Sequence, residues 1–287
     1  MKKWPRRLAP SAMTRGKWFS VFAVLAMLSL SLAVVSNSLP HANASAASNL
    51  IASDTFNRTI SNGWGTANKG GAWTVLDSPT SWSVAPGVGK ITTAANLEYR
   101  AVLNSVAVQD VSLLAKIVLP RCSDAGTNCD AYVIGRYNGG SSPSYYRIGV
   151  VQGAGQQTVY LRSQRGDGST ISSDINTGIA AATNVTLWIR VQFIGINPTV
   201  IHAHVWKNGT TEPTTWLLNT TDTASAEQVA GAVGVRVRNE DSATSHLFRY
   251  QTYKAFSLAS GTPTPTPSPT MTMTATGTPT VSKTYDK

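Results

Sequence analysis

The chain has 287 residues, of which 24 are Lys or Arg and 14 are Asp or Glu, and charged residues make up only 13% of it. Six of the cations lie in residues 1–47 without any acid, so residues 48–260 keep sixteen cations against thirteen acids. This near-balance excludes nucleic acid as the partner behind the high overall charge, and a charged fraction well below the usual ~25% favours an extracellular protein.

The N-terminus has the order of regions found in a secretory signal peptide. Residues 2–17 are basic, residues 18–35 are apolar apart from serines, and residues 41–47 are mostly small, with two Ala-x-Ala cleavage sites. We predict a signal peptide over 1–46 and a secreted or cell-surface protein that has no membrane contact after cleavage. An uncleaved anchor is the alternative, because the eighteen residues of 18–35 can just span a bilayer.

Residues 49–259 have the pattern of one β domain. Short alternating runs, rich in Val, Ile, Tyr and Trp, lie between clusters of Gly, Asn and Ser, and no helical period extends beyond one or two turns. This pattern predicts an all-β fold, a two-sheet antiparallel β-sandwich of the jelly-roll type. The predicted strands are 73–76, 81–85, 89–93, 99–103, 110–119, 131–137, 145–151, 158–164, 186–194, 199–206, 232–238 and 246–257.

The two cysteines of the chain, Cys122 and Cys129, have six residues between them. A short loop that contains Gly and Asn can bring their Cα atoms within disulfide distance, and an oxidising compartment favours the bond. A closed zinc site needs four ligands, and no nearby His or second Cys pair supplies them. We therefore predict a disulfide that staples a loop.

Residues 260–287 follow the β domain and begin with alternating Thr and Pro. This composition has no apolar period to bury and favours an extended, disordered linker or tail. Such a spacer either leads to a further domain or reaches into a cell wall.

The central strands each combine an aliphatic face with a face of Arg, His, aromatic and Gln side chains. Aromatic rings stack on sugar rings, and Arg hydrogen-bonds carboxylate or sulfate oxygens, so the second face indicates glycan binding with a preference for acidic polysaccharides. Structural packing of Arg stems on aromatic rings is the alternative, and the strands could divide between two sheets. The candidate ligand-binding residues are Tyr132, Arg136, Tyr145, Arg147, Tyr160, Arg162, Trp188, Arg190, His202, His204 and Trp206.

Two stretches of the domain carry a family resemblance. Asp54-Thr-Phe-Asn-Arg-Thr leads into Gly63-Trp-Gly-Thr-Ala-Asn-Lys-Gly-Gly-Ala-Trp73, and the second half contains Trp188-Ile-Arg-Val-Gln-Phe-Ile-Gly and Val205-Trp-Lys-Asn-Gly. Over nearly all of 49–259 the chain resembles a family of secreted bacterial domains with concanavalin A-like or laminin G-like jelly rolls. The resemblance implies a fold and an extracellular location, but no particular ligand.

The resemblance also bears on a structural calcium. Members of the wider jelly-roll group bind calcium, which takes oxygen ligands, and Asp54 is the candidate ligand here. Capping of the Arg58 region is the alternative role of this carboxylate. Family members often carry an acidic pair in the last strand, whereas this chain has Phe248-Arg-Tyr-Gln-Thr-Tyr-Lys254, a departure that weakens the case for calcium. Trp64, Trp73 and Trp216 are interpreted as packing anchors.

A glycosidase signature is missing from the sequence. Glycoside hydrolysis uses two carboxylates that flank one bond, whereas the adjacent residues Glu240 and Asp241 would point to opposite faces of a strand. We predict a non-catalytic, lectin-like carbohydrate-binding module, a monomer whose partner is a polysaccharide or cell-wall glycan. A structural or adhesive spacer domain of the cell envelope without a small ligand is the alternative.

A polysaccharide lyase is the third hypothesis. Removing a proton next to a uronate needs a base, an acid and a partner for the carboxylate. His202 or His204 is the candidate base, a nearby Tyr the acid, and Arg190 or Arg147 the carboxylate partner. The hypothesis requires a hairpin through 194–200 that sets Arg190 beside the histidines, and the R-x-E and Q-x-H motifs of such lyases are missing from the sequence.

Overall fold

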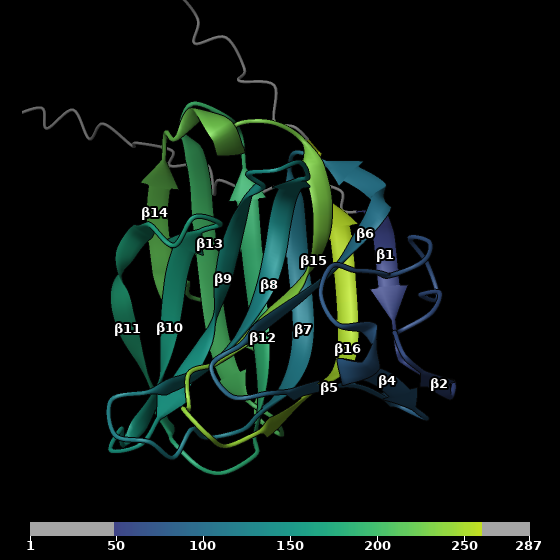
Figure 1. Ribbon diagram of the computed structural model, residues 1–287. Coiled ribbons are helices and arrows are strands. Elements are labelled where there is room, and N and C mark those ends of the chain that lie inside the picture. The colour runs from purple at the N-terminus through teal and green to yellow at the C-terminus, as the bar shows by residue number, and fades with distance from the viewer. Residues whose placement is uncertain (1–48, 260–287) are drawn as a thin grey trace, which may run out of the picture. The chain divides into compact units, whose positions relative to one another are not determined.

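A computed structural model describes residues 49–259 of the chain. These residues form two antiparallel β-sheets packed face to face (Figure 1). The predicted signal peptide (1–46) and the predicted Thr/Pro tail (260–287) lie outside the described residues, so both stay predictions. Within 49–259, no helix has the length and apolar character needed to cross a membrane.

The larger sheet has nine strands. Eight follow the order β14-β13-β12-β7-β16-β5-β4-β2, and β1 pairs with β16. Their bounds are β1 (Asn49–Asp54), β2 (Ile60–Ser61), β4 (Trp82–Ala85), β5 (Val88–Thr93), β7 (Val111–Leu119), β12 (Val185–Ile194), β13 (Thr199–Lys207), β14 (Leu218–Asp222) and β16 (His246–Ser257).

The smaller sheet has seven strands in the order β11-β10-β9-β8-β15-β6-β3. Two short 3-10 helices, η1 (Pro79–Ser81) and η2 (Ser225–Glu227), lie in connections between strands. The strand bounds are β3 (Thr74–Val75), β6 (Glu98–Val108), β8 (Asn128–Asn138), β9 (Ser144–Gly153), β10 (Thr158–Arg165), β11 (Thr170–Ala180) and β15 (Gly231–Asn239).

Alternating residues of both sheets build the core between them. In β12, Leu187, Ile189, Val191 and Phe193 are fully buried, while the residues between them are half-buried. A shift of the strand by one residue would turn this apolar set toward solvent, so the pattern fixes the register. The two-sheet antiparallel sandwich predicted from the sequence is thus confirmed.

The strands that the sequence did not predict are short or lie at sheet edges. All twelve predicted strands are present, and β1, β2, β11 and β14 were missed. β11 and β14 are the outermost strands on one side of their sheets, and β11 contains no buried residue. An edge strand is held largely by its backbone pairing, so its side chains need no apolar alternation that a sequence pattern could reveal.

An aromatic cluster occupies the core beside the first strands. Trp64 is fully buried and meets Phe56, Trp73 and Trp82 edge-on, with ring centroids 4.8 to 5.1 Å apart. Edge-to-face contacts of this kind add to the free energy gained by burying the rings. Trp64 and Trp73 are therefore packing anchors, as the sequence indicated.

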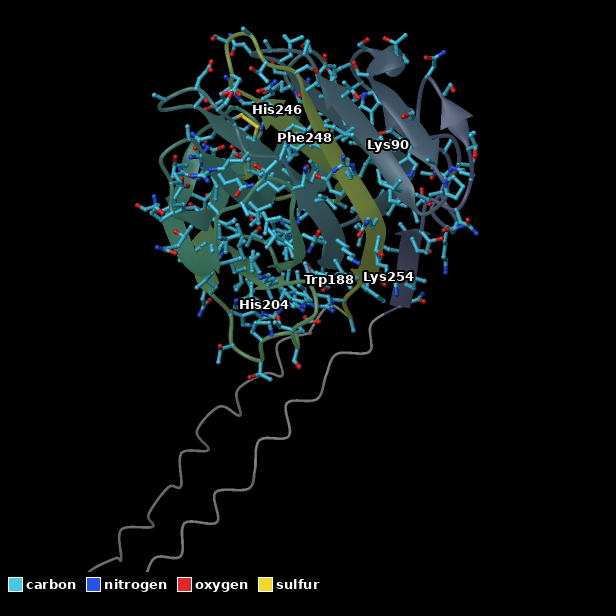
Figure 2. The ribbon with its side chains drawn as sticks, turned by 90° about the horizontal axis from the view of Figure 1, so that it is seen from below. Lys90, Trp188, His204, His246, Phe248 and Lys254 are labelled. Atoms are coloured by element: carbon cyan, nitrogen blue, oxygen red, sulfur yellow. A yellow bond between two sulfur atoms is a disulfide. The ribbon has the colours of Figure 1, made fainter. Side chains whose placement is uncertain are left out.

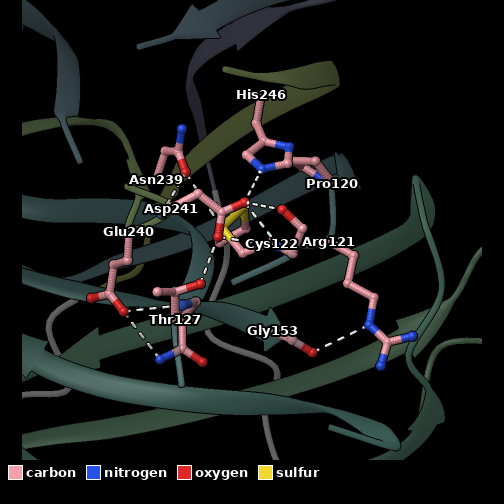
Figure 3. The surroundings of a disulfide bond; sticks show 12 residues. Pro120, Arg121, Cys122, Thr127, Gly153, Asn239, Glu240, Asp241 and His246 are labelled. Carbon is pink, nitrogen blue, oxygen red and sulfur yellow. Dashed lines mark hydrogen bonds and ion pairs between the residues drawn. A yellow bond between two sulfur atoms is a disulfide. The ribbon is translucent and has the colours of Figure 1, made fainter. Parts of the chain in front are cut away.

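The predicted disulfide between Cys122 and Cys129 is present. The loop that it closes is also held by Asp241, a fully buried carboxylate that follows β15 (Figure 3). Its donors, at 2.6 to 3.1 Å, are the backbone N–H groups of Ser123 and Asp124, the hydroxyls of Ser123 and Thr127, and Nε2 of His246.

Reduction of this disulfide should leave the domain folded. The chain-entropy argument gives only about 2–3 kcal/mol for closing so short a loop, and the hydrogen bonds to Asp241 hold the loop independently of the sulfur atoms. We expect circular dichroism of the protein to show a modest drop in melting temperature with dithiothreitol and an unchanged spectrum at 25 °C. Loss of the β-sheet spectrum on reduction would contradict this minor role.

Candidate functional site

The predicted ligand-binding residues do not share one surface. All of them except Arg136 divide between the outer faces of the two sheets, which point in opposite directions. Tyr132, Arg136, Tyr145, Arg147, Tyr160 and Arg162 belong to strands of the seven-stranded sheet, and Trp188, Arg190, His202, His204 and Trp206 to strands of the nine-stranded sheet. The strands that carry these residues thus divide between two sheets, which was one of the alternatives that the sequence left open.

Arg136 lies on neither outer face. Strand alternation placed it beside Tyr132, but the register of β8 shifts between Gly135 and Asn138, and Arg136 takes a left-handed backbone with φ of 54°. A bulge adds one residue and reverses the faces that follow it. The Arg136 guanidinium is therefore fully buried, 3.6 Å from Asp110, and donates to the carbonyl oxygens of Gln109, Gly195 and Glu227 and to Oγ1 of Thr199.

On the nine-stranded sheet, β12 and β13 bring six polar or aromatic side chains together. Their register pairs Trp188 with Trp206, Arg190 with His204, and Gln192 with His202, as a hairpin through 194–200 requires. The two indoles stack with centroids 6.0 Å apart. Figure 2 shows Trp188 and His204 at one side of the domain, opposite His246 and the disulfide.

The loop between β13 and β14, residues 208–217, covers part of this face. Its Trp216 stacks on His204 at 4.4 Å between ring centroids and on His202 at 5.3 Å. Its Glu212 pairs with Arg190 and accepts a hydrogen bond of 2.9 Å from Nε2 of His204. The loop thus adds an indole and a carboxylate to the side chains that the strands supply.

A cavity of about 640 Å³ lies between this loop and the sheet. Its wall contains a guanidinium, an imidazole, an amide, a carboxylate and an indole within one surface. The lining residues are Ser112, Arg190, Gln192, Ile194, His204, Glu212, Pro213, Thr214, Trp216, Phe256, Leu258 and Ala259. Trp188 and Trp206 lie on the same sheet face but outside this lining.

The charges in the cavity compensate one another. Burial alone would raise the pKa of Glu212, but hydrogen bonds from Arg190 and His204 outweigh it and lower that pKa. Glu212 is therefore ionised at neutral pH and offsets the charge of Arg190. His202, beside the cavity, has a pKa lowered by burial, which favours its neutral form. The site offers hydrogen-bond donors and acceptors without a strong excess of either charge.

Sequence reasoning missed two residues of this site. Trp216 was interpreted as a packing anchor and is instead a half-buried wall of the cavity. Glu212 was not singled out. Both lie in a loop, where neither the period of a strand nor a spacing rule fixes the direction of a side chain. The available signal was the presence of Glu, Pro and Trp shortly after a predicted strand, 199–206, that carries two His and a Trp.

The outer face of the seven-stranded sheet is more deeply covered. Tyr132 and Tyr145 are almost completely buried, whereas Tyr160 and Arg162 are half-buried. Arg162 forms ion pairs with Asp130 at 3.2 Å and Asp174 at 2.7 Å. Sequence alternation predicted the outward orientation of these side chains but not the shielding of the two tyrosines.

Asp54 does not fit a calcium ligand. Its buried carboxylate accepts hydrogen bonds of 2.7 to 2.8 Å from Arg58, from the backbone N–H of Phe56 and from Nε1 of Trp73. Calcium needs several oxygen ligands, whereas N–H donors occupy both oxygens of Asp54. The alternative role, in which Asp54 holds the Arg58 region, agrees with these contacts.

Comparison with known proteins gives the fold. No model of a known protein family matches the chain, and no curated protein matches its sequence. The catalytic domain of an endo-1,3-beta-glucanase (laminarinase) from Thermotoga petrophila RKU-1 has a TM-score of 0.51 and 8% sequence identity, covering 75% of this chain and 99% of that chain. The fold is a jelly-roll β-sandwich. The family suggested by the opening motif stays a prediction.

Two further solved structures have lower TM-scores. A glycoside hydrolase family protein from Mycobacterium thermorestibile has a TM-score of 0.47 and 10% identity, covering 72% of this chain and 100% of that chain. The CBM2 module of an evolved Dit protein from Lactobacillus casei BL23 phage J-1 has a TM-score of 0.46 and 8% identity, covering 74% of this chain and 97% of that chain. At these identities a likeness describes the fold alone.

Proposed function

We propose that the chain is a secreted or cell-surface, non-catalytic carbohydrate-binding module whose ligand occupies the cavity on the nine-stranded sheet. The observation that carries the proposal is the combination of Trp216 with Arg190, His204 and Glu212 around one cavity. An indole packs against the C–H face of a sugar ring, while the polar groups exchange hydrogen bonds with its hydroxyls. The balanced charge suits a neutral sugar at this site.

The cavity favours binding over hydrolysis. A glycosidase uses two carboxyl groups, one of them protonated, whereas among residues 49–259 Glu212 is the only carboxylate in the lining. Hydrogen bonds from Arg190 and His204 stabilise its ionised form, so it is a poor proton donor. The lyase hypothesis has a similar difficulty, because the part of the chain that the structure describes contributes no tyrosine to the lining and Arg147 belongs to the other sheet.

Affinity gel electrophoresis of the exported protein tests the proposal. Gels containing xylan, laminarin or hydroxyethyl-cellulose should retard the wild-type protein in at least one case, and Trp216→Ala should weaken retention about tenfold or more, the equivalent of roughly 1.4 kcal/mol. Arg190→Gln should act in the same direction, because it removes a hydrogen-bond donor and releases Glu212.

The matched control is Trp188→Ala, which removes an indole from the same sheet face but outside the cavity lining. It should keep wild-type retention. Retention by none of the polysaccharides would contradict the proposal and favour the structural spacer domain. Undiminished retention of Trp216→Ala would place the binding site elsewhere. A lyase would instead release unsaturated products, detectable by their ultraviolet absorbance, from a uronate polymer.

A further inference from the structure

The outer face of the seven-stranded sheet carries five arginines, and four of them have carboxylate partners. Arg147, in the middle of β9, is the exception: among residues 49–259 it forms neither an ion pair nor a side-chain hydrogen bond. The paired residues are Arg100 with Asp77, Arg162 with Asp130 and Asp174, Arg236 with Glu98, and Arg238 with Glu98 and Glu240.

Arg147 is nevertheless buried, with only 7% of its surface exposed. Its Nε has no hydrogen-bond partner, and its guanidinium carbon lies 5.6 Å from the ring centroid of Tyr132. The guanidinium of Arg236 lies over the same ring at 5.3 Å. A guanidinium has five N–H donors, and contact with a ring face does not replace the hydrogen bonds that these donors form with water. Burial of this unpartnered cation therefore costs free energy.

A small cavity lies close to Arg147, although Arg147 is not part of its wall. The turn between β10 and β11 passes over this part of the sheet, and a Cβ atom on Gly168 would lie 3.4 Å from Nη2 of Arg147. The same turn supplies Gly166 and Asp167 to a neighbouring cavity of about 370 Å³, whose wall also contains Arg100, Ser144 and Glu227. Burial raises the pKa of Glu227 and so disfavours its charged form. Nε of Arg100 likewise has no hydrogen-bond partner. The side chain of Arg100 thus lines this cavity and that of Arg147 lies beside Gly168 of the adjoining turn, and each has a buried Nε without a hydrogen-bond partner.

We propose that Arg147, together with Arg100, binds an anionic group of a polysaccharide, either the carboxylate of a uronic acid or a sulfate ester. Both groups present coplanar or forked oxygens that a guanidinium engages through paired hydrogen bonds. The site goes beyond the proposed function, because it lies on the sheet opposite the cavity of Trp216. The sequence predicted a preference for acidic polysaccharides. This site would locate that preference on the seven-stranded sheet, whereas the charge-balanced cavity does not account for it.

Isothermal titration of the exported protein with polygalacturonate, dextran sulfate and uncharged dextran tests this site. We expect binding of at least one polyanion and no binding of dextran. Arg147→Met keeps the aliphatic stem over Tyr132 but removes the charge, and it should weaken polyanion binding about tenfold or more. Binding of polygalacturonate alone would identify a carboxylate site, and binding of dextran sulfate alone a sulfate site.

A second variant should act in the opposite direction. Asp167 is exposed, lies in the cavity wall and accepts its hydrogen bonds from Ser169. Ser169 and the charges of Arg165 and Arg147 together lower the pKa of Asp167, so it is ionised and repels an incoming anion. Asp167→Asn should therefore strengthen polyanion binding about two- to threefold at low salt.

Arg238→Met is the matched control, because it removes one positive charge from the same sheet face but from an arginine paired with Glu240. It should change binding less than twofold, the size of a general charge effect. If Arg147→Met fails to fold, Arg147→Lys replaces it; that variant keeps the charge, loses the paired hydrogen bonds and should still weaken binding severalfold.

The test separates this site from the proposed function. Trp216→Ala should leave polyanion binding intact, and Arg147→Met should leave retention by neutral polysaccharides intact. Absence of polyanion binding, or polyanion binding that survives replacement of Arg147 unchanged, would overturn the anion site whatever the outcome for neutral ligands.

Discussion

Asp241→Asn should lower the free energy of unfolding by about 2–4 kcal/mol at pH 7, because the substitution removes a buried charge on which several donors converge. The side chain is fully buried and receives backbone and side-chain hydrogen bonds from the disulfide loop, together with one from His246. An amide can accept only part of this set, and its NH₂ group would face donors. Urea unfolding monitored by tryptophan fluorescence measures the difference.

The effect should depend on pH in a defined direction. Burial would raise the pKa of Asp241, but hydrogen bonds from His246, Thr127 and the loop N–H groups outweigh it and hold that pKa well below its ordinary value of 3.8. The folded state therefore binds fewer protons than the unfolded state, and this stabilisation is complete above about pH 4 and lost as the pH falls below it. The difference between wild type and Asp241→Asn should shrink between pH 4 and pH 2.

Asp167→Asn is the control for this experiment, since it makes the same chemical change at an exposed position. It should alter stability by no more than about 0.5 kcal/mol. An Asp241→Asn difference that is as large at pH 2 as at pH 7 would show that the carboxylate charge is not its source.

Arg136→Met should destabilise the domain by about 3–5 kcal/mol and leave glycan binding unchanged in the fraction that remains folded. The substitution leaves the buried carboxylate of Asp110 without its cation and removes donors from three carbonyl oxygens and from Thr199. Equilibrium unfolding in urea measures the loss, and titration with polysaccharides at low temperature measures binding.

Two companion variants define the origin of that loss. Arg136→Met combined with Asp110→Asn should recover part of the stability, because the unpaired charge is then gone. Arg238→Met removes a half-exposed arginine whose partners are also accessible, so it should cost less than about 1 kcal/mol. A loss of glycan binding with unchanged stability in Arg136→Met would restore Arg136 to the ligand site.

Period-two alternation was a reliable guide where a strand inside a sheet keeps a regular register. It placed Arg190 on one face of β12 and the two histidines on one face of β13, and the structure pairs Arg190 with His204 across these strands. It failed at Arg136, because a single added residue in β8 reverses the alternation and leaves no trace in the apolar pattern. Alternation within a strand also does not reveal to which sheet the strand belongs. It therefore could not separate the outer faces of the two sheets.

Loops set a second limit. The cavity on the nine-stranded sheet exists only because residues 208–217 fold back so that Trp216 covers His204. Asn208 and Gly209 form a turn in which Gly209 has φ of 92°, and this turn opens the long loop 208–217. The path of such a loop depends on contacts between residues distant in sequence, which local patterns do not encode.

The pairing of β1 with β16 has a mechanical consequence. Asn49 lies opposite Ser257 and Asp54 opposite Tyr253, so the two ends of residues 49–257 meet at one point of the sheet. A pulling force applied at these two ends would load the backbone hydrogen bonds one after another, as in opening a zipper, rather than all together in shear. Peeling of β1 would meet its main resistance only at Asp54, where the bonds to Arg58 and Trp73 anchor the strand in the aromatic core.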